Sequence, residues 1–383
     1  MTRVPRIVLP VLVASQFAGT SLWFAVNAVM PDLQRAWGLP PEALATATSA
    51  VQLGFVAGTL AFALLMLADR FAPPRVFLVC SLLGALCNGA IAWLEGSFTA
   101  LLALRFAVGF FLAGIYPVGM KIAASWYREG LGAALGVLIG ALVLGTALPH
   151  GLRALGGDAV LAIEGAGPLA SWQVVVLAVS ALAALGGLAV AALLPAHPAP
   201  PGARVDVRAL GAIFTDRRLR ASVLGYFGHM WELYAFYVLV PLVLATRLQA
   251  TAVSAWAFLV IAAGALGCVG GGLLARRFGS AHVAAVQLGT GAVCGLLSPW
   301  LLTAPWPVFA AWLLLWGVTV AGDSPQFSTL TARNAPPAVV GSVLTFTNCI
   351  GFAISVATIE LFVRAAQSAP LAAVLPWLAA GPL

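Results

Sequence analysis

The sequence predicts an all-α polytopic membrane protein whose twelve transmembrane helices form two pseudo-symmetric six-helix bundles. Composition is the first reason, because the 383 residues are 62% hydrophobic and only 8% charged, whereas soluble domains carry about 25% charged residues. Length is the second reason, since a helix needs roughly 20 apolar residues to cross the hydrocarbon core and about twelve such runs fill the chain. The third reason is an internal repeat that relates the two halves of the chain.

The repeat is clearest between LRFAVGFFLAGIYPVGMK, residues 104–121, and the stretch that begins at Trp312. The two copies share small residues and prolines at one constant offset: Gly109, Ala113, Gly114 and Pro117 align with Gly317, Ala321, Gly322 and Pro325. At a nearly equal offset, Pro31 aligns with Pro241. The charges differ, because Arg105 aligns with a leucine and Asp323 with an isoleucine. The two halves therefore share a backbone plan but carry different polar groups.

The apolar runs are expected to be helices, because the bilayer core holds no water to pair with exposed backbone groups. The expected spans are 7–29, 43–67, 75–94, 99–122, 131–149, 170–194, 220–245, 252–275, 281–302, 307–330, 338–362 and 369–383. No cleavage site follows a short apolar core in the first run, which predicts a retained span and not a signal peptide. The last run holds three prolines, so either the chain is cut inside the twelfth helix or that helix is short and irregular.

The spans divide the chain into an N-terminal six-helix bundle, 1–194, a linker, 195–219, and a C-terminal six-helix bundle, 220–383. The linker is Pro-rich and then basic, which is typical of a connection between units. A long loop of small residues, roughly 150–169, follows the fifth expected span.

Arginine predicts the orientation of the chain in the membrane. Four arginines fall in loops on one side: Arg35, Arg153, Arg247 and Arg364. The other loop arginines fall on the opposite side, and an excess of arginine marks the cytoplasmic side. This predicts a cytoplasmic N-terminus and a multi-pass protein of the inner membrane, with the linker inside. It also accounts for the net charge of +7 without nucleic acid as a partner.

Motifs for other chemistry do not stand out. The five cysteines lie in apolar runs without metal or redox spacing, which favours a packing role. We find no His/Glu metal motif, nucleophile elbow or phosphate loop. We therefore expect no cofactor, no enzymatic activity and no ATP drive, which leaves an ion gradient as the energy source.

Three local patterns carry a resemblance to a known family. LLMLADRFAPPR, residues 64–75, is similar to a family loop signature, although Leu65 and Ala72 stand where glycines are usual. RFAVGFFLAG, residues 105–114, is similar to a fourth-helix arginine signature, and GVLIGALVLGTALPHG, residues 136–151, partly resembles a fifth-helix antiporter signature. On these motifs the sequence resembles the major facilitator superfamily over essentially its whole length. LWFAVNAVMP and GIYPVGMKIAASW are loosely similar to its nitrate/nitrite-porter and cyanate-permease branches, and the subfamily stays open.

The resemblance implies roles for some residues. In the loop signature, Asp69 with Arg70 and Arg75 would form a conformational latch that caps the gap to the eleventh helix and helps hold the outward-open state. The arginine of the fourth helix, here Arg105, is often tied to proton coupling in the family. The antiporter signature is weakened because the glycine before its proline is missing and His150 follows the proline.

Arg105 is the first ionisable group expected inside a span. An arginine at the centre of a span costs roughly 2.5–3.5 kcal/mol on insertion scales and usually marks a functional site. The functional interpretation is an anion anchor or a proton-coupling residue, which we favour. The structural alternative is a set of hydrogen bonds to backbone carbonyls near the outer end of the helix.

Glu232 and His229 are the next candidates, three residues apart on one face of the seventh expected helix. Burial favours the neutral forms of both groups, so the pair could take up and release a proton as the cavity alternates. Asp323 lies in AGDSP, where glycine and proline are expected to break the helix. It reads as a proton or cation site, or as the partner of Arg105 or Lys121. A fixed structural pair is the alternative in each case.

Neutral polar and aromatic residues complete the candidate substrate contacts, with Arg105: Asn27, Gln52, Tyr226, Trp231, Tyr237, Gln326 and Asn348. Each of these side chains more often makes a helix–helix hydrogen bond or a packing contact than a ligand contact. Lys121 is expected near the inner end of its span, where it snorkels to the interface or contacts a gate.

A parallel six-plus-six repeat is typical of secondary transporters with a site near the midplane between the halves. We therefore expect a monomeric carrier, embedded in the lipid bilayer, that couples a small anionic or zwitterionic solute to protons by alternating access. Two alternatives remain open on the same fold, a proton-driven multidrug or metabolite exporter and a non-transporting membrane sensor.

Overall fold

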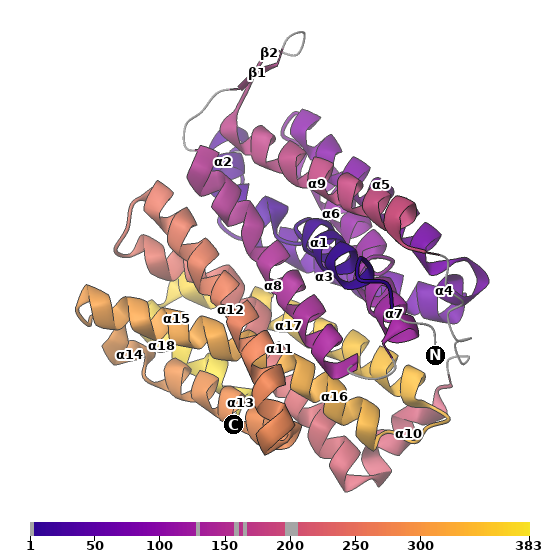
Figure 1. The fold of residues 1–383 in the computed structure, drawn as a ribbon. Helices are drawn as coiled ribbons and strands as arrows, with labels where there is room; N and C mark the ends of the chain where they lie inside the picture. Colours follow the sequence, from indigo (N-terminus) through magenta and orange to yellow (C-terminus); the bar gives the residue numbers. More distant parts are fainter. Residues whose placement is uncertain (1–3, 128–130, 157–160, 164–166, 196–205) are drawn as a thin grey trace.

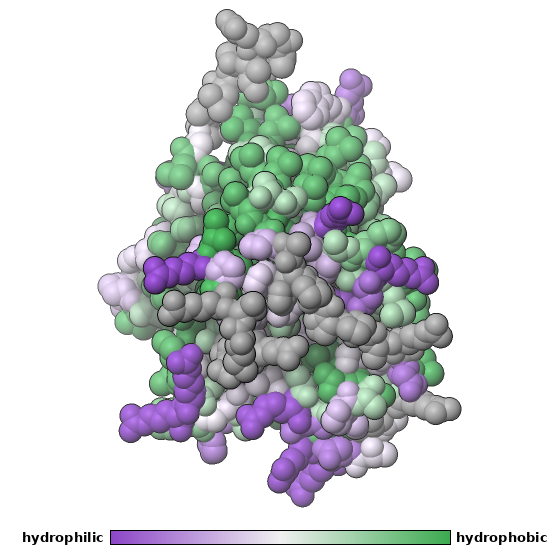
Figure 2. Space-filling view, turned by 45° about the vertical axis from the view of Figure 1, so that its right-hand side comes forward, coloured by the Kyte–Doolittle hydropathy of each residue, from purple (hydrophilic) through white to green (hydrophobic). Residues whose placement is uncertain are grey.

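The computed structural model describes residues 4–127, 131–156, 161–163, 167–195 and 206–383. Figure 1 shows two groups of helices side by side, with the first half in indigo to magenta and the second half in orange to yellow. Hydrophobic side chains cover the upper part of the face in Figure 2, and hydrophilic ones gather toward its lower end. The predicted fold class, an all-α membrane protein of two six-helix bundles, is confirmed.

The first half contains the following elements: α1 (Val8–Thr20), α2 (Ala25–Trp37), α3 (Ala43–Leu64), α4 (Leu67–Arg70), α5 (Pro73–Ala90), the 3-10 helix η1 (Ile91–Trp93), α6 (Phe98–Leu112), α7 (Tyr116–Trp126), α8 (Leu131–Gly156), strands β1 (Leu161–Ile163) and β2 (Gly167–Leu169), and α9 (Ser171–Leu193). β1 and β2 pair antiparallel, with Leu161 opposite Leu169.

The second half contains these elements: α10 (Arg208–Thr215), α11 (Arg217–Ala245), α12 (Ala250–Phe278), α13 (Ser280–Leu296), α14 (Ser298–Leu301), α15 (Trp306–Gly322), α16 (Ser324–Asn334), α17 (Val340–Ser368), α18 (Leu371–Val374) and the 3-10 helix η2 (Leu375–Ala380). We call the end of the molecule with β1 and β2 the hairpin end, and the end with α4 and α10 the linker end (Figure 1).

Helical segments stand at all twelve expected spans. Among the described residues, ten segments are long and apolar enough to cross a membrane. The ninth and twelfth expected spans correspond to two shorter apolar helices, Ser280–Leu296 and Leu371–Ala380. The last segment is short and irregular, with four α-helical residues followed by six in a 3-10 helix.

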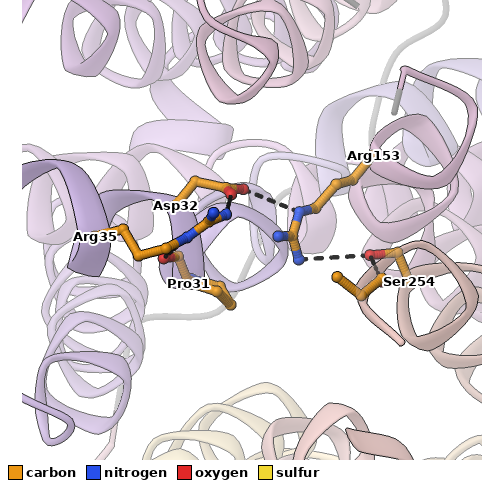
Figure 3. Close-up of polar contacts among 6 residues, drawn as sticks. Pro31, Asp32, Arg35, Arg153 and Ser254 are labelled. Atoms are coloured by element: carbon orange, nitrogen blue, oxygen red, sulfur yellow. Dashed lines mark hydrogen bonds and ion pairs between the residues drawn. The ribbon is translucent and has the colours of Figure 1, made fainter. Parts of the chain in front are cut away.

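Two helices run further than expected. The first span continues through Pro31 to Trp37, and the fifth continues through Pro149 to Gly156, so the predicted loop 150–169 is wrong at its start. The two extensions support each other, because Arg153 of α8 lies 3.0 Å from a carboxylate oxygen of Asp32 of α2. Arg35 binds the other carboxylate oxygen (Figure 3).

The linker region is only partly described, since residues 196–205 lie outside the described part of the chain. Within the predicted linker range the structure forms α10, and α11 begins at Arg217, earlier than the expected 220. The side chain of Asp216 accepts a hydrogen bond of 2.7 Å from the Leu219 amide. This N-cap satisfies one of the unpaired amides at the start of α11.

The internal repeat is visible in the helix packing. A Cβ atom built on Gly58 of α3 would lie 2.4 Å from the carbonyl oxygen of Phe110, and one built on Gly267 of α12 would lie 1.9 Å from that of Val318. Phe110 and Val318 are equivalent at the offset that aligns Gly109 with Gly317, and Gly58 and Gly267 correspond to within one position. Glycine therefore lets the second and fourth helices of each half cross at backbone contact, as small residues do in membrane bundles.

The two halves touch along α3 against α17 and along α8 against α12. Polar contacts near the hairpin end join them. Ser49 of α3 donates to Glu360 of α17 at 3.0 Å, and Arg153 of α8 donates to Ser254 of α12 at 3.5 Å (Figure 3).

The first span is broken between α1 and α2, and Arg105 holds that break together. Its guanidinium is fully buried and donates to the carbonyl of Leu22 at 3.0 Å and to the carbonyl of Trp23. Asn88 also accepts from it at 3.5 Å. A helix break frees carbonyl groups that lipid cannot satisfy, and these hydrogen bonds match the structural alternative given for Arg105. Arg105 therefore holds the backbone in place at Trp23 and its neighbour Phe24.

We expect Arg105→Met to lower stability, because it leaves buried carbonyls without donors at a cost of about 1–3 kcal/mol each. The thermal unfolding midpoint of purified protein in detergent measures this, with the exposed Arg364→Met as the control. A variant as stable as wild type would remove the supporting role.

We expect Gly267→Ala to destabilise the bundle, because the added methyl overlaps the Val318 carbonyl and overpacking costs about 1–3 kcal/mol. Gly270 on the same helix has open space at its Cβ position and provides the matched Gly270→Ala control. The same thermal unfolding assay compares them. Equal midpoints for the two variants would contradict the close crossing.

Candidate functional site

Aromatic side chains from both halves close the centre of the molecule. Trp23 stacks on Tyr234 at a ring distance of 5.9 Å and on Phe352 at 5.5 Å. Phe55 lies 4.5 Å from the ring of Phe352. Trp23 and Phe55 belong to the first half, and Tyr234 and Phe352 to the second. This cluster therefore spans the boundary between the halves.

Cavities lie on both sides of the aromatic cluster. The hairpin-side vestibule has a volume of about 330 Å³, and the linker-side vestibule has about 380 Å³. Between them lies a space of about 40 Å³, which we call the waist. Tyr237 lines both the waist and the hairpin-side vestibule, whereas Tyr226 and Asn348 line both the waist and the linker-side vestibule. The three spaces thus follow one path between the halves.

A buried pair of ionisable side chains lies at the waist, and one of its two members, His229, lines the cavity. Nδ1 of His229 on α11 lies 2.7 Å from a carboxylate oxygen of Asp323, and both side chains are 1% exposed. Asp323 stands at the break between α15 and α16, the helix interruption predicted from AGDSP. Nε2 of His229 and the second carboxylate oxygen of Asp323 have no hydrogen-bond partner among the described residues. The pair therefore keeps free hydrogen-bonding capacity beside a cavity.

Glu232 does not pair with His229 as the sequence spacing suggested. Its carboxylate accepts a hydrogen bond of 2.5 Å from Nε1 of Trp316 on α15. The carboxylate also packs against Gly291 of α13. The reason is the 60° offset between residues three apart on a helix, which sends the two side chains to different neighbours. Glu232 lies inside the second half, and it lines none of the three cavities described above.

The first half has an apolar counterpart of the His229–Asp323 contact. The offset that aligns Pro31 with Pro241 places Gly19 at the position of His229, and Ile115 aligns with Asp323. A Cβ built on Gly19 would lie 2.7 Å from Cγ2 of Ile115. The same helix crossing therefore exists in both halves, and only the second half carries ionisable groups there.

Asn27 and Gln52 are engaged within the first half. Asn27 donates to the hydroxyl of Thr48 at 2.7 Å and also lines the hairpin-side vestibule. Gln52 accepts from Nε1 of Trp23 at 3.0 Å, while its own amide nitrogen has no partner among the described residues. Gln52 therefore fixes one ring of the aromatic cluster.

The remaining predicted contacts lie in the second half. Tyr226 donates to Asn348 at 2.7 Å beside the waist, and the hydroxyl of Tyr237 has no partner among the described residues. Gln326 is buried on α16. Trp231 points toward the C-terminal segment instead, where its indole donates to the Trp377 carbonyl at 3.1 Å. The structure thus brings Tyr226, Tyr237 and Asn348 together but places Trp231 elsewhere.

The predicted latch residues lie at the linker end. Asp69 on α4 forms an ion pair with Lys121 of α7, and Lys121 also donates to the Ala68 carbonyl at 2.9 Å. Arg70 and Arg75 are exposed. Lys121 therefore lies at a polar contact within the first half, and it is not the partner of Asp323.

Sequence reasoning missed two polar groups near these sites. Trp316 lies seven residues before Asp323, so the two residues fall on the same helix face. That spacing could have identified Trp316 as a candidate from the sequence. His150 stood out only as a departure from the glycine signature. In the structure it is 3% exposed and lines the hairpin-side vestibule.

Comparison with known proteins adds the family. No curated protein matches the chain. Among solved structures, a bacterial homolog of the human lysosomal transporter Spinster, in an inward-facing and unoccupied conformation, has a TM-score of 0.73 and 15% identity. That match covers 96% of this chain and 84% of the other.

Two further structures cover nearly the whole of both chains. The E. coli fucose:proton symporter FucP (N162A) has a TM-score of 0.69 and 16% identity over 99% of this chain and 98% of its own. The human organic anion transporter MFSD10 (TETRAN) has a TM-score of 0.74 and 18% identity over 98% of this chain and 97% of its own.

These structural matches show the fold. The sequence itself matches the family model of the Major Facilitator Superfamily over residues 12–358. That range contains both copies of the repeat and all the residues that line the waist. The chain belongs to the major facilitator superfamily.

Proposed function

We propose that the chain is a proton-coupled secondary transporter of a small anionic or zwitterionic solute, which it moves through the waist by alternating access. The His229–Asp323 pair carries this proposal. The two groups are buried between cavities that reach toward opposite ends of the molecule, so a conformational change would expose them to one side at a time. Ionisable groups inside a membrane span are expensive and usually mark ion pathways.

A proton fits this pair better than a larger ion. The waist is only about 40 Å³ in volume, and the contact of 2.7 Å leaves no space for an ion between the two side chains. Protonation of Asp323 weakens its attraction to His229. The free-energy difference between two conformations then depends on whether the proton is bound, as a coupled transition requires. Besides His229, the titratable residues that line the waist are Tyr116 of α7 and Tyr226, Tyr234 and Tyr237 of α11. Outside the lining, Glu232 lies three residues after His229 on α11, and the Cys268 thiol of α12 donates to the Ala321 carbonyl.

The polar lining of the vestibules supports an anionic or zwitterionic solute. Among the described residues, those that line the two vestibules include Arg333, His150 and several amides but no carboxylate. This basis replaces Arg105, whose two terminal nitrogens donate to the backbone carbonyls of Leu22 and Trp23. One structural relative is named an organic anion transporter, which agrees with an anionic solute, and another is named a fucose:proton symporter, which agrees with proton coupling only.

The orientation follows the arginine distribution: the linker end lies in the cytoplasm and the hairpin end outside the inner membrane. In that frame, residues 1–194 and 220–383 rock as two units joined by the linker 195–219, and the carrier acts as a monomer. Ser49–Glu360 and Arg153–Ser254 then hold the outer ends of the units together.

A multidrug exporter is the second candidate, and the aromatic cluster favours it. Trp23, Phe55 and Phe352 offer an apolar surface that would suit hydrophobic cations. Such a carrier would show broad specificity, and cationic drugs would compete with one another for efflux.

The proposal predicts that Asp323→Asn and His229→Gln reduce pH-gradient-driven accumulation of an organic anion to the level of empty vesicles. Exchange of labelled for unlabelled anion at equal pH should persist, because it needs no net proton movement. Uptake into proteoliposomes of labelled benzoate, succinate and lactate measures both activities.

Glu232→Gln is the matched control, since the amide oxygen can still accept from Trp316 and the residue lies away from the cavities. It should keep coupled uptake. Loss of coupling in Glu232→Gln with normal coupling in Asp323→Asn would move the proton site to Glu232. Efflux of cationic drugs without any anion uptake would favour the exporter.

A further inference from the structure

Two residues that line the hairpin-side vestibule carry buried polar atoms without partners. Nε2 of His150 on α8 and the hydroxyl of Tyr237 on α11 are both buried, and neither has a hydrogen-bond partner among the described residues. Both residues line this vestibule. An unsatisfied buried donor costs about 1–3 kcal/mol, so two of them in one cavity call for an explanation beyond packing.

The vestibule is built like a ligand pocket. Its volume of about 330 Å³ lies within the range of roughly 300–1,000 Å³ typical of small-molecule sites. Its walls are mainly apolar, with Met30, Leu44 and Val363 among them, and a few amides complete the polar lining. Few, well-placed polar groups on apolar walls are the usual arrangement of such sites.

The charge around the vestibule favours a negative group. None of the lining residues in the described part of the chain carries a carboxylate, so these residues offer a cationic amine no counter-charge. At its rim, next to Pro31, Asp32 is bound by both Arg35 and Arg153 (Figure 3). That cluster keeps one positive charge in excess, which attracts anions toward the vestibule.

We propose that His150 and Tyr237 form a subsite for the carboxylate group of the solute, separate from the waist. Nε2–H of His150 and the hydroxyl of Tyr237 each donate a hydrogen bond to the carboxylate. This rests on the proposed function only for the identity of the solute class, because the subsite is a binding site whether or not transport is coupled to protons. One donor comes from each half, so a bound carboxylate links the halves.

The test is equilibrium binding of labelled benzoate, salicylate and succinate to the full-length protein in lipid nanodiscs. Benzyl alcohol and benzylamine are the neutral and cationic probes of matched shape. We expect at least one carboxylate to bind while the alcohol and the amine do not compete with it. Tyr237→Phe and His150→Phe should each weaken binding about tenfold, the effect of one lost hydrogen bond to a charged acceptor.

Tyr127→Phe is the matched control, since it removes a tyrosine hydroxyl directly after the end of α7, from a residue that lines none of the three cavities. It should leave carboxylate affinity within about twofold of wild type. If His150→Phe does not fold, Tyr237→Phe carries the test alone. Unchanged affinity in Tyr237→Phe, equal competition by benzylamine, or no binding of any of the three acids overturns the subsite.

Asp323→Asn separates this inference from the proposed function. It should keep carboxylate binding at the vestibule while it loses coupled uptake. Binding that depends on Tyr237 in a protein without coupled uptake would uphold the subsite and reject the proton-coupled carrier. Coupled uptake together with carboxylate binding that does not depend on Tyr237 would uphold the proton-coupled carrier and reject the subsite.

Discussion

Asp323 and His229 meet at a break in the tenth span, within 2.7 Å of each other and almost completely buried. An ionised Asp323 would not be stable alone at that depth, because burying an unpaired charge costs several kcal/mol. The contact therefore ties the broken helix to α11, and it places a titratable pair at the narrowest point between two cavities. At the equivalent crossing of the first half, Gly19 lies against Ile115. The two halves therefore differ at this crossing, because only the second half has ionisable side chains there.

The rest of the bundle positions that pair. Arg105 binds the carbonyls of the broken first span and so fixes Trp23 in the aromatic cluster beside the waist. Backbone-to-glycine contacts at Gly58 and Gly267 keep the second and fourth helices of each half at short distance. These supports lie within single halves, whereas the aromatic cluster and the vestibules lie between halves. That division is what rocking of two rigid units requires.

Hydropathy and the repeat were enough to predict the twelve spans, the two bundles and the break at Asp323, because these depend on composition and local chain geometry. Side-chain partners were not predictable in the same way. Glu232 and His229 are close in sequence, yet helix rotation directs one to Trp316 and the other to Asp323. Hydrogen bonds to backbone carbonyls were one alternative for Arg105, but the sequence did not identify which carbonyls, since the break that it supports lies in another helix. His150 became a candidate only when its cavity was visible.

The central claim is that protonation at Asp323 and His229 shifts the balance between conformations. Spin labels on exposed sites of the two halves test it without a known substrate, with Leu155 and Trp300 at the hairpin end and Leu65 and Phe278 at the linker end. We compare the distance between the two spin labels at each end at about pH 5 and at about pH 8. In the wild type the two distances should change in opposite directions, and Asp323→Asn should abolish the change. The same pH response in Asp323→Asn, or none in the wild type, would contradict the account.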